Sequence, residues 1–252
     1  PEILEEARKL GISINHPEDI IIDFHIAEKD LPKLNGFEKK AHRDDITIHY
    51  EKSELMDAKW LSIRPAWQQH YIKSRDFRVV PCSACAAYGE QAEDIVMESN
   101  IKKVRQPFLY PIGSNEILVS MEVKGLLESS GLKGFSFRPV KVRNDKTVLS
   151  TMEQLVIEEL LPPAVRNDPS EYQDFLECPK CGTKHNVPKP TAELKLDHSI
   201  MEQQKNDIYK TSEYFGYIGF EHEIIISQNF YHFLAAHGLR NSVTVDRIVR
   251  LV

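Results

Sequence analysis

Residues 116–133 (EILVSMEVKGLLESSGLK) and residues 223–240 (EIIISQNFYHFLAAHGLR) align with each other without gaps. Internal similarity of this kind indicates a repeated structural unit. We therefore expect the two stretches to adopt the same fold. Their identical residues are Glu116 and Glu223, Ile117 and Ile224, Ser120 and Ser227, Leu127 and Leu234, Gly131 and Gly238, and Leu132 and Leu239.

Each stretch predicts a strand, a helix and a second strand. The first strand ends at Ser120 or Ser227, whose hydroxyl can accept a hydrogen bond from the first free N–H groups of a helix. Gly131 and Gly238 follow at the place where a left-handed residue commonly ends a helix. Alternating apolar residues then predict a half-buried strand, which begins one residue later in the second copy.

The similarity continues upstream of these stretches. Residues 61–66 (LSIRPA) resemble residues 155–157 together with 161–164, and a Cys-x-x-Cys pair follows each segment. We therefore predict a first repeat unit over 58–146 and a second over 152–252. The second unit is expected to carry an insertion near the polar residues 197–210.

Residues 1–57 stand outside this repeat and form an N-terminal extension with helical and strand-forming segments. The pattern predicts a helix over residues 2–10, a strand over 19–26 and another over 45–50. The predicted fold is α/β of the α+β kind, with two strand–helix–strand units around mixed sheets and a zinc knuckle between them.

Four cysteines occur in the chain, all in Cys-x-x-Cys spacing, and this spacing places two thiolates on one zinc ion. Gly182, directly after the second pair, can adopt the positive φ that a tight knuckle requires, whereas Ala86 stands at that place in the first copy. Two thiolates from each unit complete a closed tetrahedral site. We therefore predict one structural Zn²⁺ ion shared by the units, with the ligands Cys82, Cys85, Cys178 and Cys181.

Two other interpretations of the cysteines stay open. Each unit could bind its own ion, with His185 or His198 completing the second site. A redox dithiol is the other possibility, but it requires a Cys-x-x-Cys that opens a helix, and residues 182–188 predict a knuckle and a loop instead.

The sequence nominates no catalytic constellation. It contains no His-Glu-x-x-His, no P-loop, no Gly-x-Gly-x-x-Gly and no Gly-x-Ser-x-Gly motif, and a closed zinc site leaves no position for an activated water. We therefore predict that the chain is not an enzyme. The formal net charge of -6 disfavours a nucleic acid as partner, and no apolar run is long enough to span a membrane. Cysteines in metal-binding rather than disulfide patterns predict the cytoplasm.

The two Cys-x-x-Cys motifs, the Glu-Ile-x-x-Ser strands and the segment Gly-Leu-Lys-Gly-Phe-x-Phe-x-Pro-Val at residues 131–140 together resemble a known family. The chain is similar to the bacterial double Cys-x-x-Cys-Gly immunity proteins, which are associated with polymorphic or contact-delivered toxins. The resemblance covers about residues 58–252. It departs at Ala86 and at Asn241-Ser242, which replace the glycine and the Gly-Phe pair.

The resemblance implies a cytoplasmic protein that binds a cognate toxin, blocks it and catalyses nothing. It nominates the four cysteines as structural ligands and leaves the toxin-binding surface undefined. The acidic charge balance would suit a basic toxin such as a nuclease. The alternative functions are a zinc-ribbon module for nucleic acid or transcription, a dithiol oxidoreductase and a purely structural partner protein.

Overall fold

The computed structural model describes residues 13–15, 23–27, 46–66, 68–71, 91–112, 116–143, 147–165, 172–180, 182, 184–188, 194–215 and 222–252. The fold mixes α and β structure, with sheets and few helices, as the sequence predicts. In the N-terminal extension, β1 (Ser13–Asn15), β2 (Asp23–Ala27) and β3 (Ile46–His49) form one sheet, and α2 (Lys52–Asp57) follows. Both predicted strands are therefore confirmed, whereas the predicted helix over residues 2–10 lies outside the described residues.

The first strand–helix–strand segment consists of β8 (Ile117–Ser120), α3 (Met121–Ser129) and β9 (Phe135–Val142). Ser120 caps the helix, because its Oγ accepts a hydrogen bond of 3.2 Å from the Val123 N–H. Gly131 follows the helix with a φ of 77°. The long strand β10 (Val148–Ile157) lies between β8 and β9 and is antiparallel to both.

The second segment consists of β16 (Ile224–Ser227), α5 (Gln228–Ala236) and β17 (Val243–Ile248), with the short 3-10 helix η7 (Arg240–Ser242) before the last strand. Ser227 Oγ accepts a hydrogen bond of 3.2 Å from the Phe230 N–H, and Gly238 has a φ of 69°. Strand β4 (Trp60–Pro65) lies between β16 and β17, antiparallel to both. The two predicted strand–helix–strand segments are thus confirmed, with their serine caps and positive-φ glycines.

The two central strands, β4 and β10, come from unexpected parts of the chain. β4 lies within the range predicted for the first repeat unit, yet it pairs with β16 and β17 near the C-terminus. β10 spans the end of the first range and the start of the second, and it pairs with β8 and β9. The central strand of the first sheet, β10, therefore precedes the second Cys-x-x-Cys pair in the sequence. The central strand of the second sheet, β4, precedes the first pair.

The remaining elements of the two sheets occupy corresponding places. In the first sheet, β7 (Phe108–Ile112) flanks β8 and β6 (Val96–Met97) runs parallel to β9. In the second sheet, β14 (Ile208–Lys210) flanks β16. The strand β18 (Arg250–Leu251), which follows β17 in the chain, forms a separate parallel pair with β13 (Lys195–Leu196). The 3-10 helix η5 (Ser99–Lys103) and the helix α4 (His198–Met201) connect these strands, and β5 (Gln68–Tyr71) extends the first sheet beyond β7.

This correspondence corrects the predicted insertion near residues 197–210. Those residues form α4 and β14, which take the place that η5 and β7 take beside the other sheet. The additional residues lie further on, between Lys210 and Ile224, where the chain contains one more strand, β15 (Tyr214–Phe215). The prediction was wrong because polar surface residues conceal two short elements that have little periodicity of their own.

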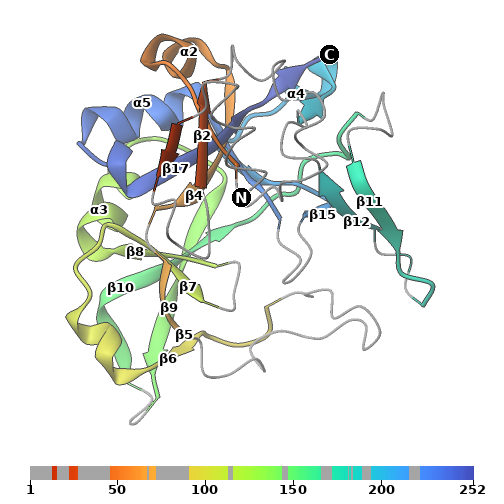
Figure 1. Ribbon diagram of the computed structural model, residues 1–252. Coiled ribbons are helices and arrows are strands. Elements are labelled where there is room, and N and C mark those ends of the chain that lie inside the picture. The colour runs from red at the N-terminus through yellow and green to blue at the C-terminus, as the bar shows by residue number, and fades with distance from the viewer. Residues whose placement is uncertain are drawn as a thin grey trace.

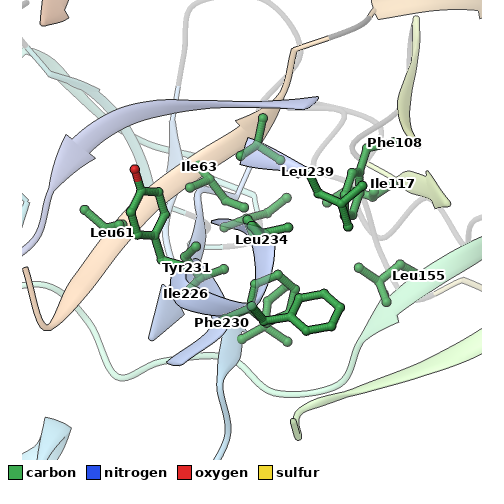
Figure 2. Close-up of a cluster of buried hydrophobic side chains, with 14 of the residues drawn as sticks. Leu61, Ile63, Phe108, Ile117, Leu155, Ile226, Phe230, Tyr231, Leu234 and Leu239 are labelled. Atoms are coloured by element: carbon green, nitrogen blue, oxygen red, sulfur yellow. The ribbon is translucent and has the colours of Figure 1, made fainter. Parts of the chain in front are cut away.

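One central core joins the two sheets. It contains alternate residues of both sheets and the inward faces of α3 and α5, so that Leu234 and Phe230 pack among residues of β4, β7, β8 and β10 (Figure 2). The labelled members of this core are Leu61, Ile63, Phe108, Ile117, Leu155, Ile226, Phe230, Tyr231, Leu234 and Leu239. The sheets with their helices lie one above the other in Figure 1.

The opposite face of each sheet is buried as well. Leu118 of β8 packs in a first flanking core with Leu109 and Met152, and Ile225 of β16 packs in a second flanking core with Tyr209 and Trp60. Burial on both faces explains why β8 and β16 are continuously apolar and not alternating.

Two buried tyrosines predict a loss of stability at high pH. Desolvation raises the pKa of Tyr209 and of Tyr231, and for Tyr231 it outweighs the attraction of Arg240. Because a raised pKa favours the neutral phenol in the folded protein, this stability is fully present below the unfolded value of about 10 and is lost as the pH rises above it.

The variant Tyr231→Phe separates this effect from other alkaline damage. The Tyr231 hydroxyl has no hydrogen-bond partner in the part of the chain that the structure describes. At about pH 8 we therefore expect an unchanged or slightly raised melting temperature, and a smaller fall above about pH 10 than in the wild type. Equal falls in thermal melts of the two proteins would contradict the assignment.

Candidate metal centre

Cys178, the first cysteine of the second pair, directly follows the first strand of a β-hairpin. The hairpin is formed by β11 (Tyr172–Glu177) and β12 (Lys184–Pro188), which are antiparallel, with Glu177 opposite Lys184. Gly182 adopts a φ of 71°, and its N–H donates a hydrogen bond of 2.8 Å to the carbonyl oxygen of Cys178. The positive φ predicted for Gly182 is confirmed. The loop predicted after it is wrong, because residues 184–188 form a strand.

The Cys178 side chain is sheltered although it belongs to a turn. Cys178 is 6% exposed, whereas the next two residues, Pro179 and Lys180, are exposed. A sheltered cysteine followed by a glycine of positive φ is compatible with the Cys-x-x-Cys-Gly turn of a zinc site. Cys82, Cys85 and Cys181 lie outside the described residues, so the four-cysteine ligand set stays a prediction.

The two histidines considered as alternative ligands lie on different elements. The backbone of His185 belongs to β12, opposite Tyr214 of β15. His198 begins α4, and its Nε2 lies 3.6 Å from Glu202 Oε1. Among the residues with described positions, which include only one of the four cysteines, no three His, Cys, Asp or Glu side chains are grouped closely enough to hold a metal ion.

The hairpin is attached to the body of the protein through β15. β12 runs parallel to β15, and Phe215 of β15 is buried in the second flanking core. Tyr214 stacks against His222, with ring centroids 4.2 Å apart. Figure 1 shows β11, β12 and β15 together at one side of the molecule, away from α3 and α5. The hairpin that carries Cys178 is therefore paired with a strand whose Phe215 belongs to the second flanking core.

A buried carboxylate fixes the segment that carries β15. Glu213 is 6% exposed, and its Oε1 accepts a hydrogen bond of 2.8 Å from the Ala164 N–H. Its Oε2 accepts a hydrogen bond of 3.0 Å from the Ser212 hydroxyl. These bonds connect the β15 segment to the chain that leads from β10 toward the hairpin.

Two further carboxylates, the buried Glu116 and the partly buried Glu223, are not singled out by any sequence motif. A glutamate beside an apolar strand is normally exposed, so the sequence alone marks them only as identical positions of the two aligned stretches. The available signal was that a glutamate stands directly before the apolar strand in both copies.

No protein-family model matches the chain, and a search of curated proteins gave no match. Among the described helices, none has the length and apolar character that crossing a membrane would require.

Proposed function

We propose that this chain is an immunity protein, which binds a cognate bacterial toxin, blocks it and uses a structural zinc site to hold its own fold together. The observation that supports the proposal is the turn at Cys178 and Gly182, with the positive φ of Gly182 and the 2.8 Å hydrogen bond from its N–H to the Cys178 carbonyl oxygen. This geometry supports the resemblance to the double Cys-x-x-Cys-Gly immunity proteins at the motif that names them.

We further propose that the two halves arose by duplication and exchanged their central strands. Equivalent hydrogen bonds in both halves support this. The Lys141 N–H donates to the Ile95 carbonyl at 2.8 Å, and the Arg250 N–H donates to the Leu194 carbonyl at 2.9 Å. Two residues later, Arg143 donates to Met97 at 2.9 Å and Val252 donates to Leu196 at 3.0 Å.

Such a duplication favours one zinc ion over two. Four thiolates around a tetrahedral ion are compatible with a twofold relation, so two equivalent cysteine pairs can share one ion. In this proposal β4 belongs to the first half but lies in the sheet of the second, and β10 belongs to the second half but lies in the sheet of the first. The segment that runs from each of these strands to the next cysteine pair therefore starts beside the opposite half. In this proposal the ion connects both crossing segments, and separate ions with His185 or His198 remain the alternative.

A binding function follows from a closed site. With four protein ligands, the ion has no open position at which to activate a water molecule, so its contribution is to folding. The net charge of -6 suits a basic toxin such as a nuclease, because complementary charge accelerates association. The proposed compartment is the cytoplasm, where thiols stay reduced and available to the metal.

Capture and rescue test this function. The tagged chain, expressed with the open reading frames that neighbour its gene, should retain one stoichiometric protein partner. That partner should arrest growth when it is produced alone, and co-production of this chain should restore growth. A partner whose toxicity the chain fails to relieve would contradict the proposal.

A zinc-ribbon module for nucleic acid is the second candidate, because a Cys-x-x-Cys-Gly turn between two antiparallel strands is also the geometry of a zinc ribbon. Binding to DNA or RNA that weakens steeply as the salt concentration rises would support this candidate. Absence of such binding, together with toxin rescue, would exclude it.

A further inference from the structure

Asp207 contacts both sheets through the four polar groups of its main chain and side chain. It directly precedes β14 of the second sheet and is half-buried. Its N–H donates a hydrogen bond of 2.9 Å to the Lys133 carbonyl oxygen, and its Oδ2 accepts one of 3.0 Å from the Lys133 N–H. Lys133 lies between α3 and β9, so both bonds connect the edge of the second sheet to the turn that enters the first sheet.

The other two polar groups of Asp207 bind the residue that caps α5. The Asp207 carbonyl oxygen accepts a hydrogen bond of 2.8 Å from the Ser227 N–H, and its Oδ1 accepts one of 2.7 Å from the Ser227 hydroxyl. The same hydroxyl oxygen accepts from the Phe230 N–H at 3.2 Å and so begins the helix. The orientation of this cap therefore depends on Asp207, and through Asp207 it depends on the turn at Lys133.

The turn at Lys133 also packs closely against the chain on either side of Asp207. A Cβ atom added at Gly134 would lie 2.5 Å from the Ile208 carbonyl oxygen and 2.7 Å from Asn206 Cβ. The backbones of the two segments are thus in direct contact. Asp207 cannot keep its bonds to Lys133 if this turn moves away from the second sheet.

The corresponding place beside the first sheet is occupied by Pro107. It directly precedes β7, as Asp207 precedes β14, and its carbonyl oxygen accepts a hydrogen bond of 2.9 Å from the N–H of Ser120, the cap of α3. Proline has no N–H and no side-chain acceptor. It can therefore bind neither a neighbouring turn nor the cap hydroxyl in the way that Asp207 does.

We propose that Asp207 is a one-sided conformational latch, through which the start of α5 loosens whenever the turn after α3 separates from the second sheet. The start of α3 has no such dependence, because Pro107 stands at the equivalent position. A carboxylate suits this role because its two oxygens accept from both sides at once, and hydrogen bonds to a carboxylate are stronger than those between neutral groups. The latch consists of groups of this chain alone and is independent of a metal or a toxin.

Hydrogen–deuterium exchange of the full-length chain, followed by mass spectrometry, tests the latch in the variant Asp207→Ala. We expect residues 131–134 and the first turn of α5 both to exchange roughly tenfold faster than in the wild type, because each loses a hydrogen bond to the carboxylate. The first turn of α3 should exchange at the wild-type rate. Asp197→Ala is the matched control, since Asp197 Oδ1 also caps a helix, accepting from the Ile200 N–H at 3.1 Å, but within its own turn.

The pattern of exchange decides the outcome. Faster exchange at only one of the two segments, or at the first turn of α3 to the same extent, would overturn the proposal. Asp197→Ala should leave all three segments at the wild-type rate. Asp207→Asn should give the same pattern as Asp207→Ala more weakly, because an amide has one acceptor oxygen where a carboxylate has two. If Asp207→Ala fails to fold, the same comparison with Asp207→Asn decides.

Discussion

Replacing Cys178 with serine should lower the melting temperature by at least about 10 °C. Binding of a structural zinc ion contributes directly to folding, and in small domains it contributes on the order of 10 kcal/mol. Loss of a buried ligand should also loosen the hairpin from β15, and through Phe215 it should disturb the second flanking core. Differential scanning fluorimetry with and without a strong chelator measures the effect.

Lys180→Ala is the control for this experiment, because Lys180 is an exposed residue of the same turn. We expect Lys180→Ala to melt with the wild type and to be destabilised by the chelator to the same extent. Cys178→Ser should already melt at the lower temperature and should not respond to the chelator. A wild type whose melting is the same with and without the chelator would contradict a structural metal.

The variant Gly134→Ala should lose roughly 3–5 kcal/mol of unfolding free energy. Gly134 has a φ of 100°, a conformation that residues with a side chain rarely adopt. A Cβ atom at this position would lie 2.5 Å from the Ile208 carbonyl oxygen and 2.7 Å from Asn206 Cβ. The strain and the clash add, because the backbone of β14 cannot retreat without breaking its pairing with β16.

Gly131→Ala separates the strain from the clash. Gly131 has a φ of 77°, but no atom lies within 4 Å of the position of an added Cβ. It should therefore lose only about 1–2 kcal/mol, the strain contribution alone. Urea denaturation of both variants gives the comparison. Equal losses would show that a Cβ atom at residue 134 does not clash with Ile208 and Asn206.

Local features of the fold were predictable from the sequence, whereas the partners of the strands were not. Ser120 and Ser227 determine where helices begin, and Gly131 and Gly238 follow the ends of those helices, because caps and left-handed residues depend on neighbours in the chain. The pairing of β4 with β16 and β17 joins segments that are distant in the sequence. A hydrophobic pattern predicts that a strand is buried but does not identify its neighbour.

The candidate site shows the same division. The positive φ of Gly182 could be predicted because the Cys-x-x-Cys-Gly motif carries its own turn geometry. The ion pairs of Glu116 and Glu223 could not be predicted, because they depend on where the strands that carry Lys210 and Arg247 lie in the sheets. Lys210 pairs with Glu116 across the two sheets, and Arg247 pairs with Glu223 within one sheet.

Native mass spectrometry of the purified chain tests the shared zinc site most directly. The wild type should carry one zinc ion per chain, and serine variants of Cys82, Cys85, Cys178 and Cys181 should each lose it, because each cysteine supplies one of four ligands. Two ions per chain, or one ion that persists when Cys82 and Cys85 are both replaced, would contradict a single site shared by the two halves.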